Sequence, residues 1–465
     1  MGKRRAIVLG GGMGGLVAAR ALAASHDVTV IERDSLATIA DARKGTPQAR
    51  HAHILLGRGR ALFGELFPGI HDELRARGAV SVRVGRTVGY LSPSGWSPPF
   101  SPTVELDGCS RDLLESVVRE RVRARPEISV LDGHVALDLI GDARRITGLR
   151  VAPRDEPTRA RAIEADLVVD ASGRGSPLPK WLAARGCTLR DDEIVDAKVV
   201  YASAITELPK MPCGWNCMFV LAAPPDVLRG GAIFPIEGGR ALTTLIGMGG
   251  DVPTDDEAAW RRFVRTRRSA LIDDILGTLP LESPIVVSRS TNNRLRPYDR
   301  ARLPAGLVPI GDSVAAFNPI YGQGMTVATI EAVALAEEIA RGDGFEVRAV
   351  RRIGKIAREA FRMAAGTDRR VPGVAGAGLS PMDRAFNRYL DAVFDVCADR
   401  SDIAHDVTRV LHLLDPPTRL FAPGLVRLAL PRTLRAPRDR GPDLPRAWRD
   451  LEPSEPGQRA STARA

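Results

Sequence analysis

The first 35 residues alternate between apolar runs and glycine-rich or polar breaks in a way that predicts a strand, a helix and a second strand. Residues 6–9 (AIVL) are uniformly apolar, residues 10–15 hold five glycines, and small apolar residues follow. The segment DVTVIERD, residues 27–34, is apolar until it ends in charges. Uninterrupted apolar runs are typical of parallel strands, which are covered on both faces. We therefore expect a β-α-β unit at the start of the chain.

Two later apolar runs are expected to add strands to the same sheet. They lie in ADLVVDASGRGS, residues 165–176, and in LVPIGDSVAAFNPIYGQGMT, residues 307–326. Between them, residues 190–290 alternate apolar and polar positions with turn-rich breaks, which favours an antiparallel sheet. Residues 345–412 have helical spacing, and residues 436–465 are rich in Pro, Arg and Ser and are expected to be largely disordered.

The glycine pattern predicts a dinucleotide-binding turn. Gly10, Gly12 and Gly15 stand in the order G-x-G-x-x-G after a predicted strand and before a predicted helix. Gly10 permits the tight turn, Gly12 lets backbone amides approach a pyrophosphate, and Gly15 allows helix and strand to pack closely. Glu32, at the end of the second strand, is placed to accept the hydroxyl hydrogens of a ribose. The helix N-terminus favours the phosphates electrostatically.

Composition and charge exclude several other functions. The chain has 465 residues and no run of about 20 apolar residues, so we expect no transmembrane segment and a cytoplasmic protein. The net charge is +10, but only six of the 66 basic residues are Lys and aromatic residues make up 5%, so nucleic-acid binding is not expected. The five cysteines are scattered, with Cys213 and Cys217 the only close pair, and His51 and His53 stand alone among cations. We therefore expect free thiols and no metal site.

The glycine turn serves NAD and FAD alike, and the downstream motifs separate them. The glycine turn, the segment 165–176 (the middle motif) and the segment 307–326 (which holds the Gly-Asp motif) are three motifs. Their order and spacing resemble the aromatic-hydroxylase class of FAD-dependent monooxygenases. That resemblance implies non-covalent FAD, with the middle motif at the cofactor phosphates and Gly311-Asp312 at the ribityl chain. Helix amides near Gly322 to Met325 would then face the N1–C2=O edge of the flavin, where reduced flavin is negatively charged.

A closer resemblance is to bacterial flavin epoxidases of polyether-antibiotic pathways. Matching segments are RKGTPQARHAHIL from Arg43, CSRDLL, VVDASGRGSP, VVYAS, FPIEGGR, SRSTNNRLRPYDR and GDSVAAFNPIYGQGM, which together extend from residue 5 to about 330. The resemblance implies that the segment from Arg43 forms part of the cofactor bed. It also implies that Arg111, at the start of a predicted helix, reaches the cofactor.

The expected fold is α/β, with a Rossmann-like FAD-binding domain of the glutathione-reductase type, an inserted, mainly antiparallel β-sheet substrate domain and a C-terminal helical region. The FAD-binding domain is expected over residues 1–185, with a small insertion near 81–100, and is completed by residues 295–345. The substrate domain is expected over 186–294, the helical region over 346–435 and a disordered tail over 436–465. Within the helical region, residues 414–430 (LDPPTRLFAPGLVRLAL) would pack on the body, although peripheral membrane contact stays open.

The residues expected to contact the cofactor come from all these motifs. They are Gly10, Gly12, Met13, Gly14, Gly15, Glu32, Arg33, Lys44, Gln48, Arg50, Arg111, Val135, Asp170, Gly173, Gly311, Asp312, Pro319, Gly322, Gly324 and Met325. The expected walls of the substrate pocket, on the antiparallel sheet, are Tyr201, Met218 and Phe234.

The resemblance implies epoxidation of an alkene in a polyketide-like or other lipophilic intermediate of antibiotic biosynthesis, through a flavin C4a-hydroperoxide. The flavin carries this chemistry, so no catalytic side chain is expected. No second dinucleotide motif occurs, so NAD(P)H would bind transiently as reductant, or a flavin reductase would supply reduced flavin. The alternatives are an aromatic or phenol hydroxylase using the same intermediate, a flavin-dependent prenyl reductase, and a non-catalytic flavin-binding partner protein. A halogenase is disfavoured because the five Trp residues are isolated and form no W-x-W motif.

Overall fold

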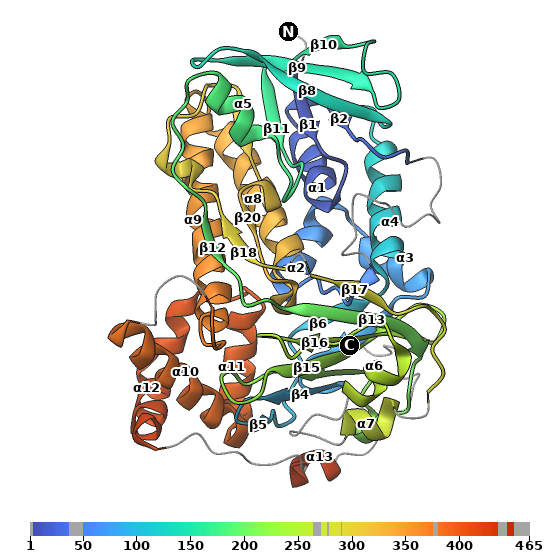
Figure 1. The fold of residues 1–465 in the computed structure, drawn as a ribbon, viewed down its shortest axis with the longest axis vertical. Helices are drawn as coiled ribbons and strands as arrows, with labels where there is room; N and C mark the ends of the chain where they lie inside the picture. Colours follow the sequence, from blue (N-terminus) through green and yellow to red (C-terminus); the bar gives the residue numbers. More distant parts are fainter. Residues whose placement is uncertain are drawn as a thin grey trace, which may run out of the picture.

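The protein has a parallel sheet with helices at one end and a large antiparallel sheet at the other (Figure 1). The computed structural model describes residues 3–36, 50–263, 271–276, 279–289, 291–374, 380–435 and 444–450. This arrangement confirms the expected α/β fold class, with C-terminal helices packed beside both parts.

The parallel sheet has the strand order β19-β11-β1-β2-β7. Its strands are β1 (Arg4–Leu9), β2 (His26–Ile31), β7 (Ile128–Leu131), β11 (Leu167–Asp170) and β19 (Leu307–Pro309), and all four neighbouring pairs run parallel. Four helices belong to this part of the molecule: α1 (Met13–Leu22), α4 (Arg111–Arg123), α8 (Gly324–Ala340) and α9 (Phe345–Asp368). The apolar runs seen in the sequence are buried here in one core with residues of the helices and of the segment 139–151.

Smaller elements complete this part of the fold. An antiparallel sheet of β8 (His134–Gly141), β9 (Ile146–Pro153) and β10 (Arg161–Glu164) covers its upper end (Figure 1). Strands β12 (Glu193–Val195), β18 (Asn293–Leu295) and β20 (Ala315–Ala316) form a second small sheet, and β3 (Val80–Arg83) pairs with β6 (Glu105–Gly108). Helices α2 (Gly57–Leu66), α3 (Ile70–Ala76) and α5 (Leu178–Ala184) also belong to this part of the molecule.

The large sheet has the order β17-β13-β16-β15-β14-β4-β5. Its strands are β4 (Val88–Ser92), β5 (Gly95–Trp96), β13 (Val200–Glu207), β14 (Cys217–Val220), β15 (Arg229–Ile236), β16 (Arg240–Gly247) and β17 (Val286–Ser288). All pairs are antiparallel except β14 with β4. Residues 88–92 and 95–96, within the small insertion expected near 81–100, supply β4 and β5 to this sheet, while residues 81–83 belong to β3. The sequence could not show this because β4 pairs with a strand more than 100 residues away.

The two faces of the large sheet pack against different parts of the molecule. One face joins Trp96, Trp215 and Trp260 in a core, beside helices α6 (Glu257–Phe263) and α7 (Leu271–Leu276). The opposite face carries Tyr201 and Ser203, which hydrogen-bond to residues of the parallel-sheet part. We call this second face the inner face. A pocket between the two parts must therefore use inner-face residues.

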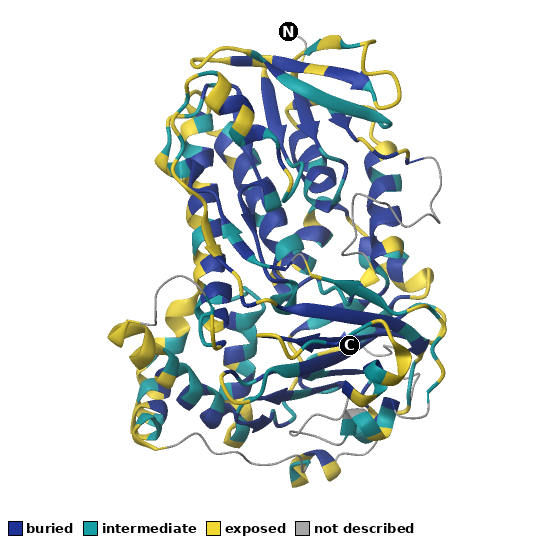
Figure 2. Cartoon of the chain, viewed as in Figure 1, coloured by how far each residue is buried: buried dark blue, intermediate teal, exposed yellow. Residues whose placement is uncertain are grey.

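The C-terminal region consists of α10 (Pro381–Asp399), α11 (Ser401–Leu411), α12 (Pro423–Ala429) and α13 (Arg446–Arg449). Leu425 and Ala429 are buried against α10, so residues 414–430 do pack on the body. The outer faces of the C-terminal helices are exposed, whereas the parallel sheet and the large sheet are largely buried (Figure 2). In the described ranges, no helix is long and apolar enough to cross a membrane.

The expected disorder of residues 436–465 is wrong for residues 444–450. Helix α13 lies there, and its Trp448 is only 1% exposed. The Trp448 ring meets Trp215 edge to face at 5.1 Å, and its Nε1 donates to Ser97 O at 2.7 Å. One large aromatic side chain thus anchors a segment whose composition favours disorder.

Candidate functional site

The glycine turn after β1 leaves space where a ligand would lie. Gly10 has φ +104°, and a Cβ at Gly15 would stand 1.8 Å from Gly10 O, so neither position accommodates a side chain. Among the described residues, a Cβ at Gly12 would meet nothing within 4 Å. Helix α1 begins there, and no side chain in the described part of the chain caps its first N–H groups. Amides at a helix N-terminus that no described side chain caps fit a pyrophosphate.

The Glu32 carboxylate accepts one backbone hydrogen bond from the glycine turn and one from the residue two positions after Glu32 itself. Its Oε2 accepts the N–H of Gly11 at 2.7 Å, and its Oε1 accepts the N–H of Asp34 at 2.8 Å. The carboxylate expected at the ribose therefore also orders the glycine turn. The backbone N–H of His134 donates to Glu32 O at 2.9 Å, which brings Val135 of β8 close to this end of the site. The Arg33 side chain is largely exposed, with its Nε 4.0 Å from an Asp34 carboxylate oxygen.

The middle motif forms a tight turn against the glycine turn. The Asp170 carboxylate accepts hydrogen bonds from Ser172 N, Ser172 Oγ and Ser176 Oγ. Gly173 has φ +85°, and a Cβ at Gly10 would stand 2.5 Å from Ala171 O. The Asp170 side chain is therefore used inside its own turn, which it shapes and places beside Gly10.

The Gly-Asp motif lies where β19 meets α8. Gly311, with φ +63°, donates its N–H to Glu331 Oε2 at 2.6 Å, which holds the turn to α8. In the described part of the chain, the Asp312 carboxylate has no hydrogen-bond partner, and a Cβ at Gly324 would stand 3.7 Å from its Oδ1. Burial raises the pKa of Asp312, while Arg174 and Arg111 oppose that shift. A carboxylate without a protein donor at this point fits a ribityl hydroxyl.

The loop that opens α8 is held by a buried polar network that the sequence did not reveal. Asn318 Nδ2 donates to Asp368 Oδ2 at 3.0 Å, and Tyr321 Oη donates to Asp368 Oδ1 at 2.7 Å. Tyr201 Oη and Ile320 N donate to Asn318 Oδ1. Asn318 lies within a quoted motif, but Asp368 lies at the end of α9 with no local signal. This network fixes Pro319 and the left-handed Gly322 at the start of α8.

Arg111 lies where α4 meets α8. It is 7% exposed, its Nε donates to Glu115 Oε2 at 3.1 Å, and its Nη1 lies against Met325 Sδ. Ser110 caps α4, and Glu237 of the large sheet accepts from both Ser110 N and Ser110 Oγ. A small cavity at this point is lined by His53, Leu55, Asp107, Cys109, Ser110, Arg111, Leu114 and Met325.

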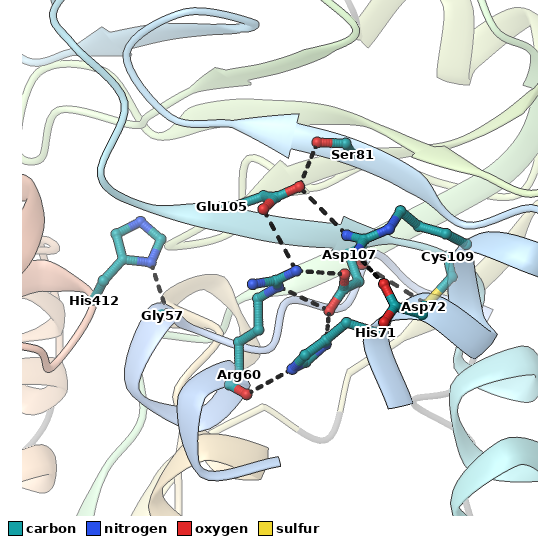
Figure 3. A network of polar contacts seen from close by, with 10 residues as sticks. Gly57, Arg60, His71, Asp72, Ser81, Glu105, Asp107, Cys109 and His412 are labelled. Carbon is teal, nitrogen blue, oxygen red and sulfur yellow. Dashed lines mark hydrogen bonds and ion pairs between the residues drawn. The ribbon is translucent and has the colours of Figure 1, made fainter. Parts of the chain in front are cut away.

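An ionic cluster surrounds Asp107, which also lines this cavity (Figure 3). Arg60 donates to both oxygens of Asp107 at 3.0 and 3.2 Å, and His71 Nδ1 lies 2.7 Å from Asp107 Oδ2. Burial alone would raise the pKa of Asp107, but the contacts with His71 and Arg60 lower it below its usual value. Asp107 lies on β6, directly before the residues that start α4, so the cluster helps to position Arg111.

The segment from Arg43 enters the described structure at Arg50, which is exposed. Lys44 and Gln48 lie outside the described residues. His51 Nδ1 is 2.8 Å from Ser203 Oγ, and Ala52 N donates to Thr244 Oγ1 at 3.1 Å, so this segment lies along the inner face. A Cβ at Gly322 would stand 3.4 Å from Ile54 Cβ. Residues 51–54 therefore lie between the large sheet and the loop that opens α8.

The three expected wall residues occupy different places. Tyr201 is on the inner face and bonds to Asn318. Phe234 is also on the inner face but is buried in a core cluster with Val82 and Leu106. Met218 is wrong as a wall residue, because its side chain is fully buried in the tryptophan-rich core of the opposite face. Adjacent strand residues alternate faces, and the sequence does not say which face turns inward.

Taken together, these residues fit a dinucleotide with a ring system at its far end. The glycine turn and Glu32 suit the adenosine and pyrophosphate, and Asp312 and the start of α8 suit a ribityl chain and flavin. In the described part of the chain, no group of three or more His, Cys, Asp or Glu is placed to hold a metal ion.

The comparisons with known proteins agree with this geometry. The sequence matches the model of a family described as FAD binding domain over residues 3–342. Protein Rv3254 of Mycobacterium tuberculosis (strain ATCC 25618 / H37Rv) is 32% identical over 343 residues, which cover 71% of this chain and 72% of that protein.

Two solved structures share the fold at low identity. PqsL, a probable FAD-dependent monooxygenase from Pseudomonas aeruginosa, has a TM-score of 0.59 at 17% identity, covering 78% of this chain and 94% of its own. The p-nitrophenol 4-monooxygenase PnpA from Pseudomonas putida DLL-E4 has a TM-score of 0.60 at 18% identity, covering 89% of this chain and 99% of its own.

Proposed function

This chain belongs to the FAD-binding domain family, with FAD as its cofactor, and on that premise we propose that it is a monooxygenase that epoxidises an alkene. The substrate we propose is a polyketide-like or other lipophilic natural-product intermediate, and the reductant is NAD(P)H. The fold shared with FAD-dependent monooxygenases supports the reaction class. The resemblance of the sequence motifs to polyether-pathway epoxidases supports the choice of an alkene.

The observation that carries the proposal is the chemistry of the inner face. Between the strand ends, β13 to β16 present only apolar or neutral side chains there: Tyr201, Ser203, Ile205, Cys217, Phe219, Ala232, Phe234, Leu242, Thr244 and Ile246. The charged inner-face residues Glu207 and Arg240 lie opposite each other in the strand register, at the end of β13 and the start of β16. An uncharged surface suits a lipophilic alkene, which needs orientation but no ionisation.

His51 and Tyr201, two ionisable side chains at this face, are poor bases. Burial lowers the pKa of His51 to about 4, so its imidazole is neutral and weakly basic at physiological pH. Burial also raises the pKa of Tyr201 well above its usual value, and nearby Asp368 adds to the shift, so its phenol stays protonated. Phenol hydroxylation benefits from a base that deprotonates the substrate, whereas alkene epoxidation requires none. This difference favours the alkene over the phenol.

Each part of the chain has a task in the proposed reaction. Bound FAD, once reduced, supplies the activation of oxygen and its transfer to the substrate. The glycine turn holds the pyrophosphate, and Asp312 holds the ribityl chain. The N-terminus of α8 offers partial positive charge where reduced flavin is negative. The inner face orients the alkene and excludes water from the reacting atoms.

Turnover with product analysis tests the proposal. The purified protein would be loaded with FAD and supplied with NADPH, oxygen labelled with ¹⁸O, and a lipophilic polyene. We expect a product that gains one labelled oxygen and opens to a diol in acid. Asp312→Ala serves as a control that should lose FAD and turnover together.

Three results would contradict the proposal in different ways. A product that gains two hydrogens without consuming oxygen would identify a reductase. Hydroxylation of a phenol such as 4-nitrophenol, without attack on the polyene, would identify an aromatic hydroxylase. A protein that binds FAD but turns over neither substrate would be a flavin-binding partner.

A further inference from the structure

A line of buried hydrogen bonds runs from the segment before α2 through the large sheet to the imidazole of His51. Ala52 N donates to Thr244 Oγ1 at 3.1 Å, and Thr244 Oγ1 lies 2.7 Å from Ser203 Oγ. Ser203 Oγ in turn lies 2.8 Å from His51 Nδ1. All the side chains in this line are at most 5% exposed. The proposed function uses Ser203 and Thr244 only as uncharged side chains of the inner face, and it gives His51 no contact with the substrate.

The number of hydroxyl hydrogens in this line and of acceptors for them favours one tautomer of His51. Thr244 Oγ1 already accepts from Ala52, and within the described residues Ser203 Oγ is the only acceptor for its own hydrogen. If Thr244 donates to Ser203, then Ser203 donates to His51 Nδ1, and every hydroxyl hydrogen is used. The reverse order would leave the Thr244 hydrogen buried without an acceptor, which is costly. The favoured tautomer therefore carries its proton on Nε2.

The Nε2–H of His51 is a buried donor without an acceptor among the described residues. Nδ1 is directed to the sheet, so Nε2 lies on the opposite edge of the ring. The ring of His51 is 5.9 Å from that of Tyr201, whose hydroxyl bonds to Asn318 in the loop that opens α8. The unpaired donor thus lies between the inner face and the loop at the expected flavin end of the site.

We propose that His51 Nε2–H binds a carbonyl oxygen of the substrate, so that the preferred substrate is an alkene that also carries a carbonyl group. The inference rests on the proposed function and narrows its substrate class. A hydrocarbon ligand would leave the Nε2–H group of His51 without an acceptor. A ligand with a carbonyl group supplies that acceptor and should therefore bind more tightly. Ser203 and Thr244 act as positioning residues, because they fix the ring and its tautomer.

A pair of matched probes tests the inference. Geranylacetone, a ketone with two alkenes, and the hydrocarbon in which a methylene replaces its carbonyl would each be titrated into the FAD-loaded protein. Binding is read from the change in flavin absorption, so it does not depend on turnover. We expect the wild-type protein to bind the ketone about tenfold more tightly than the hydrocarbon. His51→Phe keeps an aromatic ring without the donor and should bind both probes equally.

Three further variants separate a specific role from general damage. His51→Gln retains an N–H donor and should keep part of the preference for the ketone. Ser203→Ala removes the hydroxyl that holds the proton of His51 on Nε2, so it should reduce the preference for the ketone. Thr206→Val removes a hydroxyl that bonds to Thr243 on the same sheet, away from this line, and should leave the preference unchanged. Full FAD content and an unaltered flavin spectrum confirm folding in each case.

The outcomes distinguish this inference from the proposed function. Equal binding of the two probes to the wild-type protein would overturn the inference and leave the epoxidase proposal standing. Failure of both probes to bind would count against the lipophilic-alkene pocket and thus against both. If His51→Phe shifted the spectrum of the ligand-free flavin but kept the ketone preference, the donor would serve the cofactor and the inference would be wrong.

Discussion

The carboxylate of Asp368 accepts a hydrogen bond from the side-chain amide of Asn318 at 3.0 Å, although the two residues are 50 positions apart. Asp368 ends helix α9, and Asn318 begins the loop that opens α8. Asn293 and Tyr321 donate to the same carboxylate. A single buried acid from a distant helix therefore holds the loop expected to face the flavin.

Replacing Asp368 by Ala should weaken FAD binding without unfolding the protein. Three donors would lose their acceptor, and the loop from Asn318 to Gly322 would be less ordered. We expect the Kd for FAD to rise about tenfold, equivalent to about 1.4 kcal/mol. Fluorescence titration of the apoprotein with FAD measures this. Asp391→Ala, which breaks an ion pair with Arg370 outside this network, is the control and should leave the Kd unchanged.

Alanine at Gly12 and at Gly15 should have opposite effects on folding and binding. A Cβ at Gly12 meets no described atom within 4 Å, so Gly12→Ala should leave the apoprotein stable but obstruct the pyrophosphate. A Cβ at Gly15 would stand 1.8 Å from Gly10 O, so Gly15→Ala should destabilise the apoprotein itself by about 3 kcal/mol. Urea unfolding of both apoproteins and FAD titration distinguish the two effects. Normal FAD affinity in Gly12→Ala would contradict the expected position of the phosphates.

Glu331 should make the protein less stable as the pH rises. Burial raises its pKa from the usual 4.5 to about 8, so the folded state holds the proton more tightly than the unfolded state does. The free energy of unfolding should therefore fall between about pH 4.5 and pH 8. Glu331→Gln keeps an acceptor for the Gly311 N–H but cannot ionise.

Thermal denaturation across this pH range measures the effect. The Tm of Glu331→Gln should exceed that of the wild-type protein at pH 8, and the advantage should shrink towards pH 5. The exposed Glu337, which pairs with Arg352, offers a matched control, since Glu337→Gln should not alter the slope. Parallel Tm profiles for wild type and Glu331→Gln would show that Glu331 ionises normally in the folded protein.

Trp448→Ala should destabilise the large-sheet part even though the residue lies 17 positions before residue 465. The substitution removes a fully buried ring, its contact with Trp215 and its hydrogen bond to Ser97 O. We expect a loss of about 3 kcal/mol in the free energy of unfolding. Arg446→Ala, at a side chain that is 90% exposed, should cause no measurable loss. Equal stability of the two variants would mean that α13 is not anchored.

The sequence by itself determined those features of the protein that depend on residues close together along the chain. Gly10 and Gly15 need no side chain because strand and helix meet there, and their spacing already predicted the turn. The apolar runs of β1, β11 and β19 predicted buried parallel strands, and FAD as the cofactor is confirmed. The individual cofactor contacts, such as those of Asp312 and Arg111, stay predictions.

Only the tertiary structure decided which distant groups meet. Alternation placed residues on two faces of a strand, but pairing and packing decided that Met218 faces the tryptophan-rich core and Ser203 faces His51. Strand β4 joined the large sheet, and Trp448 ordered part of the tail, because each packs against residues far along the chain. Burial then set the pKa of His51 and Glu331. Hydrogen bonds and burial of this kind depend on distance in space, which spacing along a sequence does not encode.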